Sequence, residues 1–327
     1  MREENKQMRI LSAIGMILVV AGHLGYALFD VGGLFPYYSF HVFIFLFVSG
    51  YFYREEAEQH LLRYIGKKCK TLLLPYFIWN LAYGILTVLL HRTGFSIGGE
   101  FTLWNLFIEP FVSGHQFLYQ FPAWFVPALF LIEVLNVLGR KVLSFLHLKK
   151  EWLIFAVSLL LGIATVALAK GGHVWGYYKF PGRLLFMMPG FQLGRIYKEK
   201  LENRVNKISD GRYFFVVVGV QLLTTICCRG LAFSAVWVTG FANAAVIPYL
   251  TVVTGIAFWL RISDWISRIP SACSWFMEIG RHTYAIMMHH VFWFFVVNSI
   301  CYLLSRTTVW CAEFDTAQFF SDINYVY

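Results

Sequence analysis

Long apolar runs, separated by short polar stretches, recur along the whole chain of 327 residues. A helix needs about 20 mostly apolar residues to cross a bilayer, and it satisfies its own backbone hydrogen bonds while doing so. The pattern predicts an all-α integral membrane protein, a polytopic bundle of about nine to ten transmembrane helices. The clear spans lie near residues 8–29, 36–53, 71–91, 122–139, 152–169, 179–197, 213–230, 242–261 and 282–304.

Two stretches depart from this pattern. Residues 101–113, FTLWNLFIEPFVS, are too few to cross and contain Pro110, which is typical of an interfacial or re-entrant segment. The tail, residues 306–327, is neither apolar enough to span nor polar enough for a plain disordered tail. No soluble domain or linker separates the runs, so we expect residues 1–327 to form a single transmembrane domain with an atypical tail.

Composition and charge agree with a membrane location. Hydrophobic residues make up 58% of the chain and charged residues 14%, whereas soluble domains have about 45–50% and 25%. The net charge is +9, and with the N-terminus inside, 20 Lys and Arg fall in or beside cytoplasmic segments against four in external ones. This asymmetry predicts a multi-pass protein of the cell membrane with a cytoplasmic N-terminus. It explains the positive charge without a nucleic-acid partner.

Metal chemistry has no support in the sequence. The six cysteines include no CxxC pair with metal-ligand spacing, and neither an HExxH nor a P-loop pattern occurs. We therefore expect no bound metal ion.

Two histidines interrupt the first two spans. His23 lies about six residues from the outer end of its span and His41 about five residues from the outer end of the next. The spans run in opposite directions, so we expect both imidazoles at similar depth, close together. Ionisable groups inside a membrane are rare and usually face a cavity, which favours a functional pair. Two independent, hydrogen-bonded core histidines are the alternative.

Three other polar side chains lie within predicted spans. Glu133 lies near mid-membrane and needs a proton or a partner, so it orients a histidine, pairs with Arg183 or makes a structural contact. Arg183 either snorkels outward or faces the cavity and holds an anion. Asn80 either makes an ordinary interhelical contact or joins the substrate-binding residues.

Basic residues gather directly before the third span. The segment HLLRYIGKKCKTLLLPY carries a cluster made of Arg63, Lys67, Lys68 and Lys70. A cluster in this position sets the topology and contacts anionic lipid. The sharper interpretation is a docking site for a phosphorylated donor on the cytoplasmic face.

The last span contains two adjacent histidines, His289 and His290, in the segment IGRHTYAIMMHHVFW. Neighbouring side chains on a helix point about 100° apart. At most one of the two is therefore expected to face a given cavity.

Together these segments resemble the acyltransferase 3 family of polytopic membrane acyltransferases, in particular the branch that acetylates sugars. Six pieces match in order and extend over nearly the whole chain. They are RILSAIGMILVVAGH (9–23), FHVFIFLFVSGYFYRE (40–55), KKCKTLLLPYFIWN (67–80), AWFVPALF (123–130), FMMPGFQLGRIYK (186–198) and IGRHTYAIMMHHVF (279–292). The most specific feature is the histidine of the first span followed by FHxxxFxFxSGYF in the second.

The resemblance implies an enzyme that moves an acyl group, commonly acetyl, from cytoplasmic acyl-CoA to a hydroxyl of an extracytoplasmic glycan or lipid-linked sugar, in the cytoplasmic membrane of a bacterium. His23 corresponds to the family's essential histidine and is the expected general base. His41 would orient His23 or donate a hydrogen bond to the oxyanion, and Glu133 completes the candidate catalytic set. Lys67, Lys68 and Lys70, with Arg63, match the basic motif expected to bind CoA phosphates. The candidate substrate-binding residues are Arg9, Arg183, Asn80 and Trp124.

Two departures from the family pattern bear on activity. The family usually carries Arg or Lys about eleven residues before the histidine, where this chain has Ser12, and Arg9 is the nearest basic residue. The family also usually has ten spans, one more than the hydropathy pattern gives here. A proton-coupled transporter and an inactive, glycan-binding or scaffolding relative are the alternatives. Direct transfer and transfer through an acyl-enzyme are both compatible with the sequence, which does not specify the oligomeric state.

Overall fold

A computed structural model describes residues 4–95, 98–114, 117–231, 241–322, 325 and 327. Every regular element within these residues is helical and none is a strand, which confirms the all-α prediction. Five helical stretches are long and apolar enough to cross a membrane: Leu61–His91, Leu118–Phe145, Glu151–Lys170, Asp210–Cys228 and Thr283–Thr307. The chain is therefore a multi-pass membrane protein.

A helix or helix run occupies each predicted span in the described residues. These are α1 (Lys6–His23), α2 (His41–Tyr51), α4 (Leu61–Lys68) continued through a π-helical turn into α5 (Leu74–His91), α7 (Phe125–Phe145), α8 (Glu151–Lys170), α9 (Lys179–Ile196), α11 (Asp210–Cys228), α12 (Ile247–Ser267) and α14 (Thr283–Thr307). Shorter helices connect them: α3 (Glu56–Gln59), α6 (Leu103–Phe107), α10 (Glu202–Val205), α13 (Pro270–Arg281) and α15 (Thr316–Ser321).

The first two helices are shorter than the apolar runs that contain them. Helix α1 ends at His23, because Gly25 adopts a φ of 76° that takes the backbone out of the helix. Helix α2 begins at His41, after Pro36 and a 3₁₀ turn at Tyr37–Ser39. The prediction that both histidines lie a turn or more inside their helices is therefore wrong, because His23 is the last residue of α1 and His41 is the first of α2.

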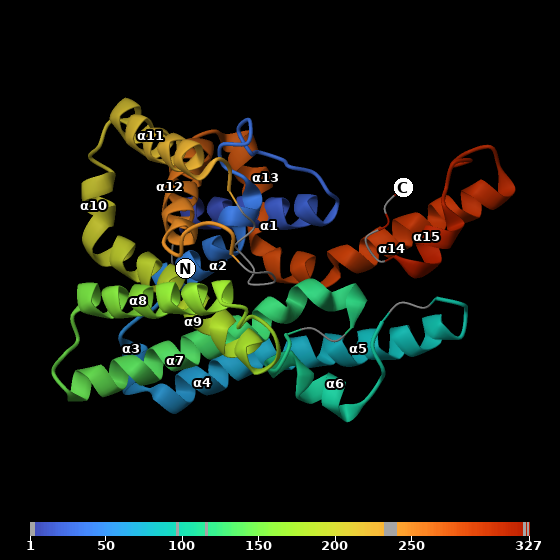
Figure 1. The fold of residues 1–327 in the computed structure, drawn as a ribbon, viewed down its shortest axis with the longest axis horizontal. Helices are drawn as coiled ribbons and strands as arrows, with labels where there is room; N and C mark the ends of the chain where they lie inside the picture. Colours follow the sequence, from blue (N-terminus) through green and yellow to red (C-terminus); the bar gives the residue numbers. More distant parts are fainter. Residues whose placement is uncertain (1–3, 96–97, 115–116, 232–240, 323–324, 326) are drawn as a thin grey trace.

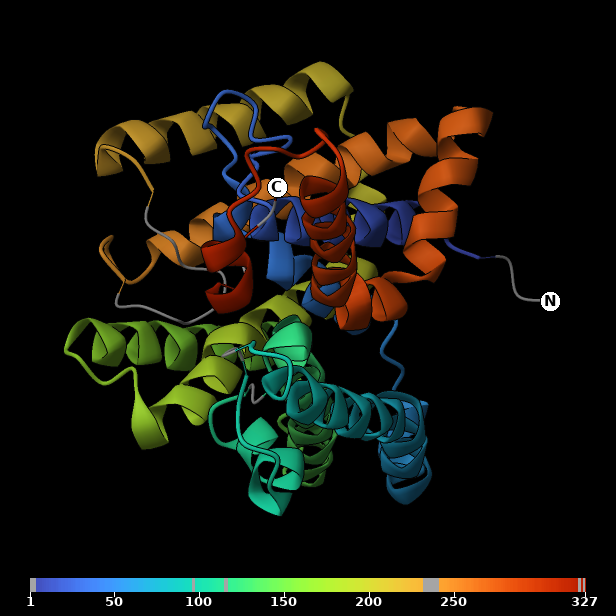
Figure 2. The same ribbon diagram turned by 90° about the vertical axis from the view of Figure 1, so that its right-hand side faces the viewer.

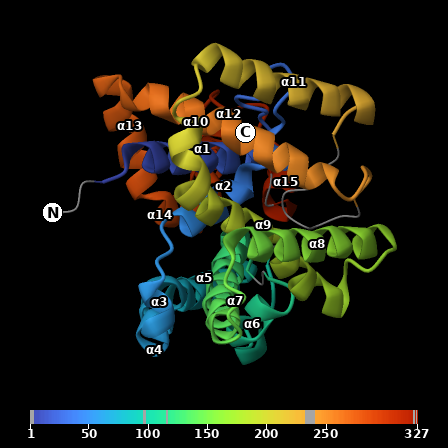
Figure 3. The same ribbon diagram turned by 90° about the vertical axis from the view of Figure 1, so that its left-hand side faces the viewer.

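Helices α2 and α9 lie between two groups of helices. On one side α1 packs against α2, α12 and α13, and α11 packs against α12, whereas on the other side α8 and α7 pack against α9 (Figure 1). The view from the left shows α1, α11, α12 and α13 above this central pair and α4, α5, α6 and α7 below it (Figure 3). The elements that carry the predicted site residues therefore surround a common centre.

Backbone contact joins α2 to α9. Gly190 and Gly194 lie one turn apart on α9, the small-xxx-small spacing that lets membrane helices approach closely. A Cβ atom at Gly194 would overlap the carbonyl of Phe47, and one at Gly50 would overlap the carbonyl of Phe191. Glycine is therefore required on both faces of this contact.

Substituting alanine at this contact should destabilise the fold. We expect Gly194→Ala to lower the free energy of unfolding by about 1–3 kcal/mol, because the added methyl meets backbone that cannot rotate away. Thermal unfolding of the detergent-solubilised protein measures the effect. Gly219→Ala is the matched control, since a Cβ atom there meets nothing within 4 Å. Equal midpoints for the two variants would contradict the role given to this contact.

The two atypical stretches also adopt short helices. Residues 101–113 form α6 and a 3₁₀ turn around Pro110, as expected of a segment too short to cross. The described part of the tail folds back on α14 through α15, where Phe319 contacts Phe95 and Phe295. Figure 2 shows these red C-terminal helices facing the viewer. No tenth long apolar helix occurs in the part of the tail that the structure describes, which leaves out 323–324 and 326.

Candidate active site

A histidine pair joins α1 to α14. The Nδ1 atom of His23 lies 3.0 Å from the Nε2 atom of His290. The other ring nitrogen of His290, Nδ1, lies 2.8 Å from the carbonyl oxygen of Ile286 and must donate to it, because a carbonyl only accepts. In neutral rings, Nε2 of His290 therefore accepts from Nδ1–H of His23. This arrangement leaves Nε2 of His23 with a free lone pair, as a general base requires.

His41 has the same kind of anchor at the start of α2. Its Nδ1–H donates to the carbonyl of Tyr37 over 2.7 Å, so the Nε2 atom of the neutral ring is an acceptor. The expectation that His41 donates to an oxyanion is therefore wrong for the neutral ring, because Tyr37 uses its single N–H. The expectation that it orients His23 is also not met, since His290 makes that contact.

His23 and His41 line one cavity, in agreement with the predicted pair. The cavity has a volume of about 290 Å³. Its walls come mainly from α1, the start of α2, the segment that leads into α7, and α9. The lining residues are Met16, Val19, Gly22, His23, Tyr37, His41, Val42, Phe45, Phe121, Pro122, Trp124, Phe125, Arg183 and Met287. We call it the histidine cavity.

Arg183 is part of the histidine cavity wall and does not snorkel outward. Its side chain is fully buried, with 0% exposure. The guanidinium carbon lies 3.9 Å from the ring centre of Trp124, so the cation rests on the aromatic face. Within the described residues, none of its three nitrogens has a hydrogen-bond partner. Trp124 and Arg183 are thus together in the cavity, as the candidate substrate-binding set predicted.

A second, larger cavity of about 780 Å³ lies farther along α2. Four of its lining residues are permanently basic, and most of the rest are polar or aromatic. They are Val48, Ser49, Phe52, Tyr53, Arg54, Glu56, Ala57, His60, Arg63, Tyr64, Lys67, Lys68, Thr71 and Glu133. We call it the basic cavity. It contains three of the four residues of the basic cluster, and Lys70 is not among those that line it.

Glu133 lies in the basic cavity, away from the histidines. The Nζ atom of Lys68 lies 2.7 Å from each of its carboxylate oxygens. The partners expected for Glu133, a histidine or Arg183, are therefore wrong, because the α4–α5 run brings Lys68 against the middle of α7. A buried carboxylate needs such a partner, and a residue on α4 supplies it.

The two cavities are consecutive along the same two helices. On α2, Phe45 lines the histidine cavity and Val48 the basic cavity, three residues or about 4.5 Å apart. On α7, Phe125 and Glu133 line the two cavities eight residues, or about 12 Å, apart. All residues between His41 and Ser49 are apolar, and so are those between Trp124 and Glu133. An apolar partition thus lies between the cavities, less than one turn thick along α2 and about two turns thick along α7.

Two candidate substrate-binding residues lie outside both cavities. Arg9 pairs with Glu4 at 2.7 Å and contacts the carbonyl of Gly280, so it does not replace the basic residue missing at Ser12. Asn80 is fully buried and donates to the carbonyl of Leu106 over 2.8 Å, which is the structural contact considered from the sequence. Arg9, the basic residue nearest to Ser12 in the sequence, is therefore not part of the histidine cavity, whereas Arg183 lines it.

His290 is the residue that sequence reasoning missed. The two adjacent histidines point to different neighbours, since His290 bonds His23 whereas His289 contacts the hydroxyl of Tyr83 at 2.8 Å. Neither is among the residues that line the histidine cavity, which agrees with the expectation that at most one would face a given cavity. The signal that could have found His290 was the HH dipeptide itself, two ionisable groups within one apolar helix.

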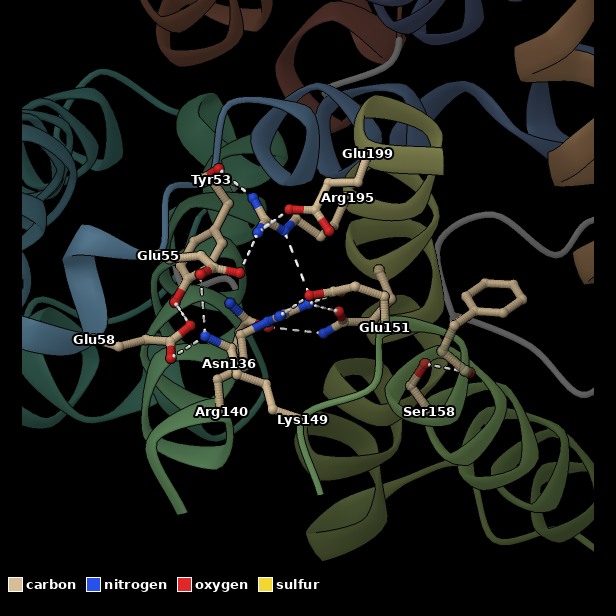
Figure 4. Close-up of polar contacts among 12 residues, drawn as sticks. Tyr53, Glu55, Glu58, Asn136, Arg140, Lys149, Glu151, Ser158, Arg195 and Glu199 are labelled. Carbon is tan, nitrogen blue, oxygen red and sulfur yellow. Dashed lines mark hydrogen bonds and ion pairs between the residues drawn. The ribbon is translucent and has the colours of Figure 1, made fainter. Parts of the chain in front are cut away.

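An ion-pair network lies next to the basic cavity and is joined to it through Tyr53, whose carbonyl accepts a hydrogen bond from Arg195 (Figure 4). Arg140 makes a two-pronged contact with Glu151 at 2.6 Å, and Arg195 binds Glu55 at 2.9 Å and also Glu199. The carboxylates of Glu55, Glu151 and Glu199 lie close enough to suggest a cation site. The guanidinium of Arg195 pairs with all three, Arg140 also pairs with Glu151 and Lys149 with Glu55, so three cations already compensate the three carboxylates.

Lys149, in the loop between α7 and α8, extends the same network. It lies 2.9 Å from Glu58 and 3.4 Å from Glu55. Burial alone would lower its pKa, but the hydrogen bond to Glu58 and the charge of Glu55 hold the pKa of Lys149 above its usual value. The lysine stays charged, so it fastens this loop to the segment that follows α2.

Comparison with known proteins gives one match. A family model described as an acyltransferase domain matches residues 5–319, a range that contains every residue lining the two cavities. It confirms the resemblance found in the six sequence pieces. No curated protein and no solved structure matches the chain.

Proposed function

The chain belongs to the acyltransferase 3 family, and on that premise we propose that it transfers an acyl group, in the simplest case acetyl, from cytoplasmic acyl-CoA to a hydroxyl of an extracytoplasmic sugar. The observation that carries this proposal is the hydrogen-bond chain from Ile286 through His290 to His23. It leaves a lone pair on a ring that borders a ligand-sized cavity.

The basic cavity is the proposed site for the donor. CoA carries several phosphates, and Arg54, Arg63 and Lys67 line this cavity on the side that the charge pattern assigns to the cytoplasm. Glu133 neutralises Lys68, so those three residues are the ones that would hold phosphate. The pantetheine arm would cross the apolar partition between α2 and α7, which extends about 12 Å along α7, to reach the histidine cavity.

The proposed reaction is direct transfer. The acceptor hydroxyl gives its proton to Nε2 of His23 while its oxygen attacks the thioester carbonyl carbon. The tetrahedral intermediate collapses, the carbon–sulfur bond breaks, and the departing thiolate takes the proton from His23. The products are the sugar ester and free CoA, and the reaction needs no ATP because a thioester is already activated.

Inverted membrane vesicles with labelled acetyl-CoA test this function. We expect label in a glycan-linked ester that mild alkali releases. Arg63→Ala/Lys67→Ala should raise the KM for acetyl-CoA about tenfold, since each residue supplies a charged hydrogen bond or ion pair to a phosphate. Lys207→Ala, an exposed lysine outside both cavities, is the matched control.

Three outcomes would contradict the proposal. Proton-driven uptake of a solute without any labelled ester would indicate a carrier. Binding of CoA without turnover, across a broad panel of acceptors, would indicate an inactive relative. An unchanged KM in the double variant would move the donor site away from the basic cavity.

A further inference from the structure

The histidine cavity contains a cation that the protein itself does not neutralise. Arg183 has 0% exposure, and none of its guanidinium nitrogens has a partner among the described residues. A buried charge is costly unless it is paired, and arginine does not lose its proton. The site therefore requires a negative group that comes from outside the chain.

The other polar groups of the cavity do not meet this requirement. The residues that line it include no carboxylate. His23 and His41 present Nε2 lone pairs, which suit a neutral hydroxyl, and Tyr37 offers a phenol. Arg183 is thus the single charged group among the lining residues, and the negative group must arrive with the ligand.

Trp124 prepares the guanidinium for such a ligand. With its carbon 3.9 Å from the indole ring centre, the guanidinium is held against the aromatic face, and within the described residues none of its buried N–H donors is used. A fixed planar fork of this kind matches carboxylate and phosphate oxygens two at a time. The donor is a poor source of this anion, because the proposed site for the phosphates of CoA is the separate basic cavity and an acetyl group is neutral.

We propose that the acceptor is an anionic sugar, with a carboxylate or phosphate group that binds Arg183 while the hydroxyl to be acylated meets His23. This inference rests on the proposed function and specifies its substrate class. A volume of about 290 Å³ is at the small end of ligand cavities. It holds about one sugar unit, so the anion and the reacting hydroxyl belong to the same sugar ring.

Matched acceptor pairs test the proposal. The purified protein in lipid nanodiscs is given acetyl-CoA with the methyl glycosides of glucuronic, galacturonic and mannuronic acid, with the corresponding neutral hexosides, and with the hexose phosphates. For at least one pair we expect kcat/KM to be about 10- to 100-fold higher for the anionic sugar, as a charged hydrogen bond allows. Comparing the sugar acids with the hexose phosphates shows whether the site binds a carboxylate or a phosphate.

Variants of Arg183 test whether this residue causes the preference for anionic sugars. Arg183→Gln should remove this preference by raising KM for the anionic sugars more than for the neutral ones, while Arg183→Lys keeps part of it. Lys170→Gln, an exposed charge outside the cavity, should keep all of it. Equal use of charged and neutral sugars by the unmodified protein would overturn the proposal. So would an equal loss with every acceptor in Arg183→Gln, which would indicate oxyanion stabilisation or a structural role.

A binding measurement separates this inference from the proposed function. In the His23→Ala background, thermal stabilisation by the sugar acids should persist and should disappear when Arg183→Gln is added. Charge-dependent binding without any acyl transfer by the unmodified protein would support the anion site and refute the enzyme. Acyl transfer with a preference for neutral sugars would support the enzyme and refute the anion site.

Discussion

Replacing His23 with glutamine is expected to lower kcat for acyl transfer about 1,000-fold and to change KM little. Glutamine is similar in length and can still bond His290, but it cannot take a proton from the attacking hydroxyl. General bases typically contribute about 10²- to 10⁴-fold. Release of the CoA thiol, followed with a thiol reagent, gives the rate, and labelled ester gives the product.

His289→Gln is the matched control for this result. His289 is next to His290 in the sequence, but it contacts Tyr83 and does not line the histidine cavity. We therefore expect this variant to keep a rate within a few-fold of the unmodified protein. If His23→Gln retains more than a tenth of the activity, the base is another group. His41 would then be the first residue to test, because its Nε2 atom is also an acceptor.

The second large effect concerns His290, a positioning residue. His290→Phe removes the ring nitrogen that accepts from Nδ1–H of His23 and leaves the ring with its hydrogen bond to the backbone of Val19, so the orientation of His23 is less firmly fixed. We expect kcat to fall about 100-fold, less than when a charged orienting partner is lost. The pH dependence of kcat should also change, because the side-chain hydrogen-bond partner of the base is gone.

A conservative variant distinguishes positioning from packing. The side-chain carbonyl of His290→Gln can accept the same hydrogen bond from His23, so this variant should recover at least tenfold over His290→Phe. Both variants should bind the sugar acids as the unmodified protein does, since Arg183 is unchanged. Equal rates for the two variants would mean that His290 only fills space.

The hydropathy pattern predicted the long helices of this chain because a membrane span depends on the apolar character of consecutive residues. The apolar runs predicted every long helix, but their length overstated α1 and α2. Near the end of α1, Gly25 turns the chain out of the helix while the sequence stays apolar, so a hydropathy pattern does not register the break. The short tail helix α15 was beyond prediction for a related reason, since contacts with Phe95 and Phe295 hold it.

The candidate site was predicted in part. His23 and His41, on two consecutive spans, line one cavity together with Arg183 and Trp124. The partnerships of His290 and Glu133 were not predictable, because they join helices 267 and 65 residues apart along the chain. A periodic pattern gives the face on which a residue lies and its depth along one helix, but not which distant helix packs against that face.

The apolar partition between the cavities has an electrical consequence. The histidine cavity contains groups that handle protons, the basic cavity contains fixed charge, and both border the same two helices. A continuous polar path between them would let ions leak and dissipate the membrane potential. The uninterrupted hydrocarbon side chains from Val42 to Val48 on α2 and from Phe125 to Ile132 on α7 oppose such a leak, because an ion there would lose its hydration. If the proposed transfer takes place here, this apolar barrier would let a neutral acyl chain cross while the membrane stays insulated.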